Sequence, residues 1–435
     1  MARLQRHDIV DACVLEVLGL VREQGWLADR ALERVLRRER RLYASERRAA
    51  AEAVYGILRS LGQLEWLLRP GMAPDLAALY AAWLARSGAA SLDAAAGRLG
   101  LARGVLSRAL ERPEERMAAI ADPVERLAVE ESLPAWIAER FVAELGLAEA
   151  RALAHAMNER APLTVRANLL RTSRDALQQR LAKEGAGARP TAFSPWALVL
   201  DGHANAFALP SFQEGLFEIQ DEGSQLIALA VGARPGRKVA DACAGAGGKS
   251  LALAAEMHGK GSLFALDSDA DRLEEAKRRA RRAGVHNLRA RPVPAGPEAD
   301  ATLADLRGAC DRVLVDAPCS GLGTLRRKPD ARWRLRPEDP ARFAALQKEL
   351  LLRFARLVKP GGRLVYATCS IGRAENADVA ELAAREIAGF SPLPLSAALG
   401  EDLARRLGAD DHALQLLPHR HGTDGFFVAA FTRAE

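Results

Sequence analysis

Two cysteines follow short apolar stretches in this sequence. Cys319 stands in Asp316-Ala-Pro-Cys-Ser-Gly-Leu-Gly, directly after Arg312-Val-Leu-Val. Cys369 stands in Ala-Thr-Cys-Ser, directly after Arg363-Leu-Val-Tyr. A buried cysteine of the core is common, and each residue alone would favour that interpretation. Two cysteines at adjacent strand ends, one flanked by Asp, Pro and Gly, are hard to explain as packing alone and are therefore candidates for a functional site.

A glycine-rich stretch forms a third candidate. It runs from Asp241 to Ser250 as Asp-Ala-Cys-Ala-Gly-Ala-Gly-Gly-Lys-Ser, between an apolar segment and a helical pattern. Such a turn lets the backbone approach a nucleotide closely, although glycines in this place can also serve packing alone. It is not a P-loop, because Cys243 occupies the position of that motif's first glycine. Asp267 ends the next apolar segment, where a carboxylate would meet ribose hydroxyls or merely cap the strand.

These residues need a sheet that brings strand ends together. From about Gly236, strand and helix patterns alternate regularly, which predicts an α/β, Rossmann-like, doubly wound and mostly parallel sheet. The predicted strands are 238–242, 262–267, 288–293, 312–316 and 363–368. If their order is 3-2-1-4-5, the fourth and fifth strands are neighbours and both cysteines face one crevice.

The sequence before this region has the pattern of helices rather than of alternating strands and helices. Apolar residues recur at helical spacing through residues 1–160, which predicts an all-α bundle with Cys13 in its core. Long helices are expected at 44–68, 76–85 and 135–156. Residues 161–220 predict a small α/β connecting subdomain, and residues 221–435 the nucleotide-binding domain.

Composition limits the function classes. The chain has 435 residues, is 49% hydrophobic and carries a formal net charge of +6. Its arginines gather in 34–48, 277–282 and 326–336, which favours phosphate contacts, although the first group could be a solvated helix face. No apolar run reaches the length of a membrane span, and five cysteines without a Cys-x-x-Cys pair predict neither a disulfide framework nor a metal site. We expect a cytoplasmic monomer.

Four motifs, in this order, resemble the RsmB/Nop2/Sun family of S-adenosylmethionine-dependent RNA cytosine-C5 methyltransferases. They are Asp-Ala-Cys-Ala-Gly-Ala-Gly-Gly-Lys, Asp-Ala-Pro-Cys-Ser-Gly-Leu-Gly-Thr-Leu-Arg-Arg-Lys-Pro-Asp, Tyr-Ala-Thr-Cys-Ser and His-Gly-Thr-Asp-Gly-Phe-Phe. The resemblance covers about residue 162 to the end. The N-terminal helices resemble, by position and helicity, the NusB-like RNA-binding domain of the bacterial RsmB branch. The resemblance implies S-adenosylmethionine as cofactor and RNA as partner, with small-subunit (16S) ribosomal RNA as the expected substrate.

The resemblance also implies roles for single residues. Cys369 would add to C6 of cytosine, and Cys319 would assist removal of the C5 proton and release of the enzyme. Asp316 would bind the base near N3, and Lys249 would position the base or favour a thiolate. The implied cofactor-binding residues are Asp241, Cys243, Ala244, Gly245, Ala246, Gly247, Gly248, Lys249, Asp267 and Asp316. The implied RNA-binding residues are Arg326, Arg327, Lys328 and Arg332.

Two departures from the family pattern stand out. Gly245-Ala246 replaces the usual Ala-Pro, and residues 286–296 lack the acid that contacts the adenine side. A weakly active or inactive RNA-binding or ribosome-assembly factor on the same fold is therefore the alternative. A methyltransferase for proteins or small molecules would not explain the paired cysteines or the basic stretches.

Overall fold

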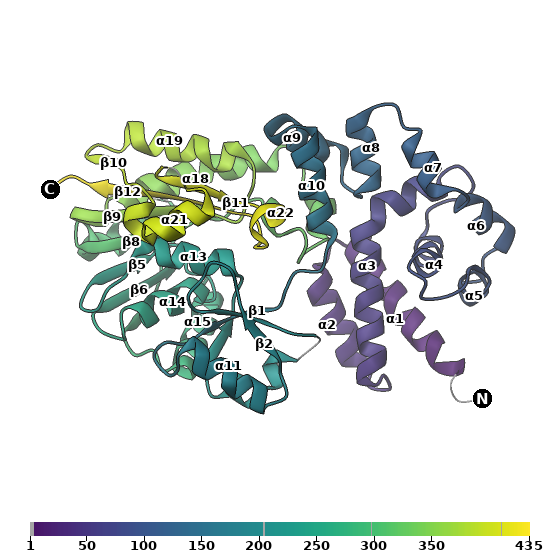
Figure 1. Ribbon diagram of the computed structural model, residues 1–435, viewed down its shortest axis with the longest axis horizontal. Coiled ribbons are helices and arrows are strands. Elements are labelled where there is room, and N and C mark those ends of the chain that lie inside the picture. The colour runs from purple at the N-terminus through teal and green to yellow at the C-terminus, as the bar shows by residue number, and fades with distance from the viewer. Residues whose placement is uncertain (1–3, 203–204, 297, 410) are drawn as a thin grey trace. The chain divides into compact units, whose positions relative to one another are not determined.

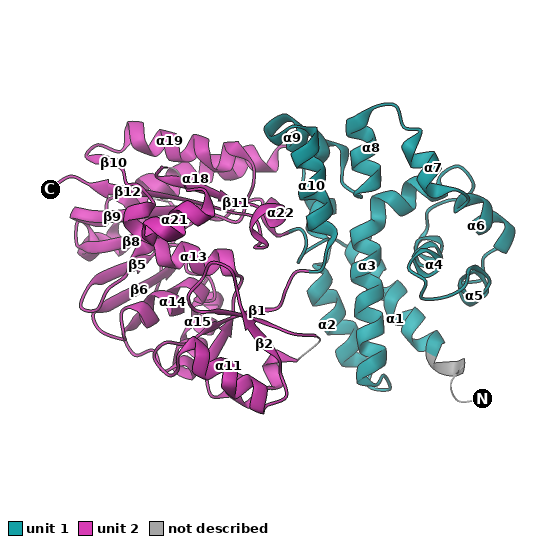
Figure 2. Ribbon diagram, in the orientation of Figure 1, with its two compact units in different colours: residues 1–160, 325–337 teal, residues 161–324, 338–435 magenta. Residues whose placement is uncertain are grey.

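The computed structural model describes residues 4–202, 205–296, 298–409 and 411–435. They form two compact units, which Figure 2 shows in different colours. The first unit holds residues 1–160 and 325–337, and the second holds residues 161–324 and 338–435. The segment 325–337 departs from the predicted division, because it packs with the helical unit although it follows a strand of the large sheet.

The first unit is built from helices. They are α1 (Leu4–Arg22), α2 (Ala28–Arg38), α3 (Ala44–Leu68), α4 (Leu76–Arg86), α5 (Leu92–Arg98), α6 (Arg103–Ala109), α7 (Pro113–Ala118), α8 (Pro123–Glu130), α9 (Ala135–Leu145), α10 (Leu147–Asn158) and α17 (Ala331–Arg334). The long helix α3 packs against α1 and α4 (Figure 1). Cys13, on α1, is buried in this core as predicted.

One predicted helix of this unit is wrong. The pattern over residues 135–156 suggested a single helix, but Gly146 separates α9 from α10 with φ 78° and ψ 160°. Only glycine adopts this backbone conformation readily, because it has no Cβ.

A small antiparallel sheet opens the second unit. Its strands are β1 (Thr164–Ala167), β2 (Ala188–Pro190), β3 (Ala197–Leu200) and β4 (Phe217–Ile219), in the order β2-β3-β1-β4. Helices α11 (Arg174–Lys183) and α12 (Pro210–Gln213) lie between these strands in the sequence. Leu177 and Leu181 of α11 pack on Val165 and Phe217 in one small core.

The large sheet has the predicted strand order. Its strands are β5 (Lys238–Asp241), β6 (Ser262–Asp267), β7 (Leu288–Pro292), β8 (Cys310–Asp316), β9 (Val358–Thr368), β10 (Phe390–Pro392), β11 (Ala413–Leu416) and β12 (Phe426–Arg433). They lie in the order β10-β12-β9-β8-β5-β6-β7, with β11 beside β12. The five central strands are parallel and correspond to 3-2-1-4-5, whereas β12 runs antiparallel to β9.

Helices cover both faces of this sheet (Figure 1). The helices of the second unit that remain are α13 (Glu222–Val231), α14 (Gly248–Glu256), α15 (Ala270–Ala283), α16 (Glu298–Thr302), α18 (Asp339–Ala355), α19 (Ala377–Glu386), α20 (Ser396–Leu399), α21 (Glu401–Leu407) and α22 (Pro418–His421). Alternation along β8 sends Leu314 toward α13 and α14, and its neighbours Val313 and Val315 toward α18 and α19.

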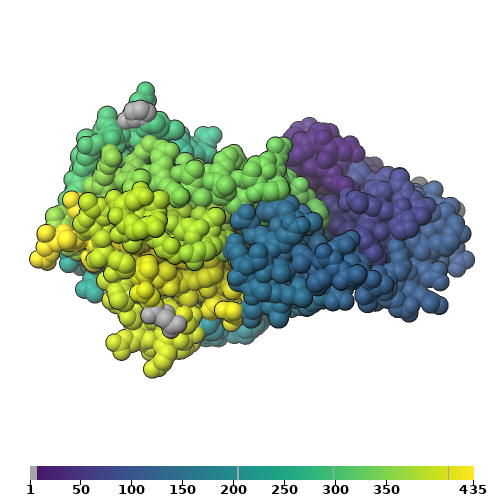
Figure 3. Space-filling model, turned by 90° about the horizontal axis from the view of Figure 1, so that it is seen from above, coloured from purple at the N-terminus to yellow at the C-terminus, as the bar shows by residue number. Residues whose placement is uncertain are grey.

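The C-terminal part of the chain completes this layered fold. Figure 3 shows its green and yellow residues lying against one another on one side of the second unit. In the parts of the chain that the structure describes, no helix combines the length and apolarity needed to cross a membrane.

Candidate active site

The two cysteines after β8 and β9 lie side by side. Strands β8 and β9 are parallel, and Asp316 at the end of β8 lies opposite Ala367 of β9. The segments that follow the two strands therefore leave the sheet at the same edge. The sulfur atoms of Cys319 and Cys369 are 3.1 Å apart, and both residues are free thiols. This proximity raises the pKa of Cys319 well above its ordinary value, and burial adds to the increase. Cys319 therefore retains its proton and can donate it in a hydrogen bond to Cys369.

A partly buried ion pair lies at the same edge. The Lys249 amine donates to the Asp316 carboxylate over 2.7 Å and lies 5.6 Å from the ring centroid of Phe426. Burial alone would lower the pKa of Lys249, but the Asp316 carboxylate raises it above its ordinary value, and a charge on Cys369 adds to this. By the same coupling, the Lys249 ammonium stabilises a thiolate at Cys369. Phe426 is a contact that the sequence reasoning did not single out.

Glycines let three chain segments meet behind the cysteines. Gly323 donates from its backbone nitrogen to the carbonyl of Cys369 over 3.0 Å and accepts from Gly425 over 2.8 Å. A Cβ at Gly323 would lie 2.0 Å from the carbonyl oxygen of Gly425 and 2.8 Å from that of Cys369. Both atoms belong to backbone, so no side-chain rotation relieves the overlap.

Replacing Gly323 by alanine should therefore separate these segments. We expect a loss of about 2–4 kcal/mol in the free energy of unfolding, as for a strongly overpacked core site, together with reduced activity. Gly71 offers a matched control, because a Cβ there meets no atom within 4 Å. Thermal unfolding of the two variants tests this, and equal midpoints for Gly323→Ala and Gly71→Ala would contradict the contact.

The glycine-rich stretch is shaped to receive a ligand. Gly247 begins α14 with φ 81°, and a Cβ there would lie 2.9 Å from Ala276. Gly245, with φ 52°, faces open space instead, since a Cβ there would meet nothing within 4 Å. The Arg279 guanidinium donates to the carbonyl of Ala246 over 2.8 Å and holds the stretch from behind. The open space at Gly245, beside the start of a helix, is compatible with the nucleoside cofactor that the resemblance implies.

Asp267 lies at the edge of the same crevice. Its carboxylate accepts hydrogen bonds from the backbone nitrogens of Gly245, over 2.7 Å, and Asp269, over 2.9 Å. Each carboxylate oxygen keeps one lone pair that could accept from a ribose hydroxyl. Asp300, which follows β7, pairs with Arg307 and Arg356, each over 3.3 Å.

Asp241, which was predicted to bind the cofactor, lies at the end of β5 beneath the glycine-rich stretch. It is fully buried, with its carboxylate accepting from the Ser250 hydroxyl over 2.6 Å. It therefore supports the glycine-rich stretch from below, and the structure does not favour a direct contact between Asp241 and a cofactor. Burial raises its pKa to about 7.

This raised pKa gives a pH prediction. Aspartate in the unfolded chain ionises near pH 3.8, whereas folded Asp241 retains its proton to about pH 7. The folded state binds more protons in this window, so stability should fall as pH rises from about 4 to about 7. Asp241→Asn cannot ionise and should flatten this part of the profile. Unfolding midpoints measured across pH 5 to 7.5 check this, and an unchanged slope would be evidence against it.

One of the four predicted RNA-binding residues, Arg332, is buried inside the helical unit. Arg332 is 0% exposed and donates to the carbonyl of Ser132 over 3.1 Å and to the side-chain oxygen of Asn158 over 2.9 Å. Burial lowers its pKa to about 9. Arg326 is 5% exposed. The prediction is wrong for Arg332, because its guanidinium cannot reach an RNA phosphate without leaving the interior of the helical unit.

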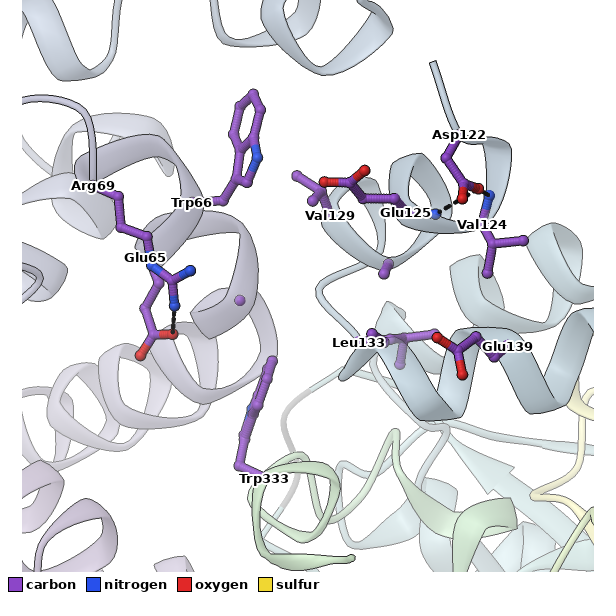
Figure 4. Close-up of a pocket in the computed structure, with 13 residues that line it drawn as sticks. Glu65, Trp66, Arg69, Asp122, Val124, Glu125, Val129, Leu133, Glu139 and Trp333 are labelled. Atoms are coloured by element: carbon purple, nitrogen blue, oxygen red, sulfur yellow. Dashed lines mark hydrogen bonds and ion pairs between the residues drawn. The ribbon is translucent and has the colours of Figure 1, made fainter. Parts of the chain in front are cut away.

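The helical unit contains a pocket of about 520 Å³ (Figure 4). Two indoles line it, those of Trp66 and Trp333. Its charged lining residues are Glu65, Arg69, Asp122, Glu125 and Glu139. A lining with four carboxylates and one guanidinium repels phosphate groups, so we do not expect this pocket to contact an RNA backbone.

Family models match much of the chain. Residues 228–432 match the model described as 16S rRNA methyltransferase RsmB/F. Residues 133–206 match the ferredoxin-like domain of RsmF/B-like methyltransferases. The second match begins before residue 161, where the connecting subdomain was predicted to start.

Similar proteins extend over nearly the whole chain. The probable ribosomal RNA small subunit methyltransferase B of Bacillus subtilis is 35% identical, covering 86% of this chain and 81% of its own. The protein of the same description from Synechocystis is 33% identical, covering 96% and 98%. Among solved structures, PH0851 has a TM-score of 0.78 at 25% identity, covering 98% of both chains. A methyltransferase homolog from Pyrococcus horikoshii has a TM-score of 0.60 at 28% identity, covering 72% of this chain and 100% of its own.

Proposed function

Since the chain belongs to the RsmB/F family of 16S rRNA methyltransferases, we propose that it methylates cytosine C5 in small-subunit ribosomal RNA. The observation that carries the proposal is the pair of thiols 3.1 Å apart, beside the Lys249–Asp316 ion pair. Methylation at a nucleophilic heteroatom needs no covalent help from a thiol. Methylation at the unreactive C5 does, so the thiol pair favours this substrate atom.

Cys369 makes C5 reactive in this proposal. Its thiolate, stabilised by the Lys249 ammonium and the Cys319 thiol, attacks C6 of the base and forms a carbon–sulfur bond. The electron pair of the C5–C6 double bond moves to C5, which becomes enamine-like and nucleophilic. Residues 243–249 and Asp267 would hold S-adenosylmethionine, which would supply the electrophilic methyl group that C5 takes up.

Cys319 acts after the attack. The hydrogen bond with Cys369 is the main reason that Cys319 stays protonated, and burial and the negative charge of a Cys369 thiolate add to it. Bonding to C6 removes that charge and the hydrogen-bond acceptor, so the pKa of Cys319 falls and its proton can pass to solvent, which leaves a thiolate. Once C5 carries the methyl group, the Cys319 thiolate takes the C5 proton, the C5–C6 double bond re-forms, and Cys369 leaves as a thiolate.

Asp316 holds the base. The resemblance assigns it to the Watson–Crick edge near N3, and the hydrogen bond from Lys249 fixes the orientation of its carboxylate. A base reaches this position only outside its stack, so the target nucleotide has to be single-stranded or flipped out. Arg327, which is half-buried, and Lys328, which is exposed, remain the proposed contacts to flanking phosphates.

A methylation assay on purified components tests the proposal. Protein, S-adenosylmethionine and unmodified small-subunit ribosomal RNA are combined, and the RNA is digested to nucleosides for mass spectrometry. The proposal predicts 5-methylcytidine with small-subunit RNA and little with large-subunit RNA. Methyl groups on another base, or only on a protein added to the mixture, would overturn it.

A further inference from the structure

A buried carboxylate behind the two cysteines has no part in the proposed chemistry. Glu375 lies in a short turn after β9 and is 0% exposed. Its Oε1 accepts from the backbone nitrogen of Ser320 over 2.8 Å and from the Gln347 amide over 3.1 Å. Its Oε2 accepts from the hydroxyls of Ser320 over 2.5 Å and Ser370 over 2.6 Å. The carboxylate thus accepts four hydrogen bonds.

The donors connect the two reactive segments. Ser320 directly follows Cys319, and Ser370 directly follows Cys369. The same Gln347 amide, on α18, also donates to the carbonyl of Pro318 over 2.9 Å. One side chain therefore joins segments that are 50 positions apart in the chain, immediately next to both thiols.

We propose that Glu375 is a positioning residue, which holds the Cys319 and Cys369 loops at the separation that the two thiols need. The catalytic part of this role rests on the proposed function. The hydrogen-bonded geometry around Glu375 does not depend on that function.

A carboxylate suits this position for a chemical reason. Four donors converge on two oxygens, and an ionised carboxylate only accepts. A glutamine would turn an NH₂ group toward two hydroxyls and could keep only part of the network, so one or both serines would reorient. Burying a charge without these bonds would be strongly unfavourable, which ties the fold of this corner to the presence of all four donors.

The Glu375 carboxylate also contributes to the raised pKa of Cys319. The contact of Cys319 with Cys369 is the main cause of this raised pKa, burial is the next, and the negative charge of Glu375 adds to both. The carboxylate therefore supports the protonated form of Cys319 in the resting enzyme as well as its position.

The test compares Glu375→Gln and Glu375→Ala with Asp311→Asn. Asp311 is also a buried carboxylate, but it lies at the opposite end of β8, where it accepts from the Lys238 nitrogen over 2.8 Å and from Arg237 over 2.9 Å. We expect all three variants to unfold at lower temperature. Glu375→Ala should lower kcat about 100-fold with little change in KM, as for misplaced reactive groups, and Glu375→Gln about 10-fold. Asp311→Asn should keep the wild-type kcat.

A second readout needs no RNA. A diazene oxidant accepts two protons and two electrons from neighbouring thiols and leaves a disulfide, which peptide mass spectrometry assigns to its two cysteines. Wild type and Asp311→Asn should form the Cys319–Cys369 disulfide at equal rates, and Glu375→Gln about 10-fold more slowly. Ser370→Ala is a milder change that should also slow formation of this disulfide. It provides the test if the Glu375 variants do not fold.

Equal oxidation rates in wild type, Glu375→Gln and Ser370→Ala would overturn the positioning role. A wild-type protein that oxidises as predicted but transfers no methyl group to RNA would leave the positioning role standing and contradict the proposed function instead.

Discussion

Replacing Cys369 by alanine should abolish methylation of RNA, with a loss on the order of 10⁴-fold or more, as for removal of a covalent nucleophile. The side chain lies beside Lys249 and Cys319, and no other thiol in the described residues is placed to replace it in that contact. Incorporation of labelled methyl groups into small-subunit ribosomal RNA measures the effect.

Cys310 supplies the matched control for this substitution. It lies on the same β8 strand, at the end remote from Asp316, and is fully buried. Cys310→Ala should cost some stability but leave the rate within about twofold of wild type, because its thiol faces the core. If Cys369→Ala methylates RNA as fast as Cys310→Ala, Cys369 is not the nucleophile.

Replacing Cys319 by alanine should have a different outcome. Cys369 can still attack C6, but the proton at C5 then has no thiolate to take it, so the enzyme stays bonded to the RNA. We expect turnover to be lost and a protein–RNA adduct to accumulate that survives denaturation and shifts the protein band on a gel. The adduct should require both RNA and S-adenosylmethionine in order to reach the methylated stage.

The double variant Cys319→Ala, Cys369→Ala controls for adventitious crosslinks and should show no shifted band. Rapid turnover by Cys319→Ala without any adduct would show that another group removes the C5 proton. A persistent adduct in the double variant would show that neither cysteine forms it.

The parts of the fold that were predictable have strong local signals. The apolar segment 262–267 is β6, and the helix over 270–283 is α15, which begins at the Asp269 cap and ends at Gly284 with φ 74°. The strand order then followed from the general rules for parallel sheets. Because these rules bring the ends of β8 and β9 together, the proximity of Cys319 and Cys369 could be predicted from the sequence alone.

The predictions for the helix over residues 135–156 and for Arg332 failed because tertiary packing overrides the local sequence pattern there. A glycine within a helical pattern is often tolerated, so nothing in the sequence distinguishes Gly146, which ends a helix, from Gly62, which lies inside one. An arginine in a basic stretch normally faces solvent. Arg332 instead enters the interior, because carbonyl oxygens of the helical unit are available there to accept its hydrogen bonds.

Glu375 escaped prediction for a related reason. A single glutamate at the beginning of a helical pattern usually indicates a solvated face or a helix cap. Its meaning depends on Ser320 and Gln347, which precede it by 55 and 28 positions and approach it only in the folded chain. The signal that could have found it is its position six residues after Cys369, close to one of the two proposed reactive groups.

The most direct test of the proposed function is bisulfite sequencing of small-subunit ribosomal RNA from cells that lack this protein. The RNA is compared with that from cells supplied again with the wild-type chain or with Cys369→Ala. We expect a cytosine that resists conversion with the wild-type chain and is converted without the protein and with Cys369→Ala. Identical conversion in all three samples would contradict both the proposed reaction and the role of Cys369.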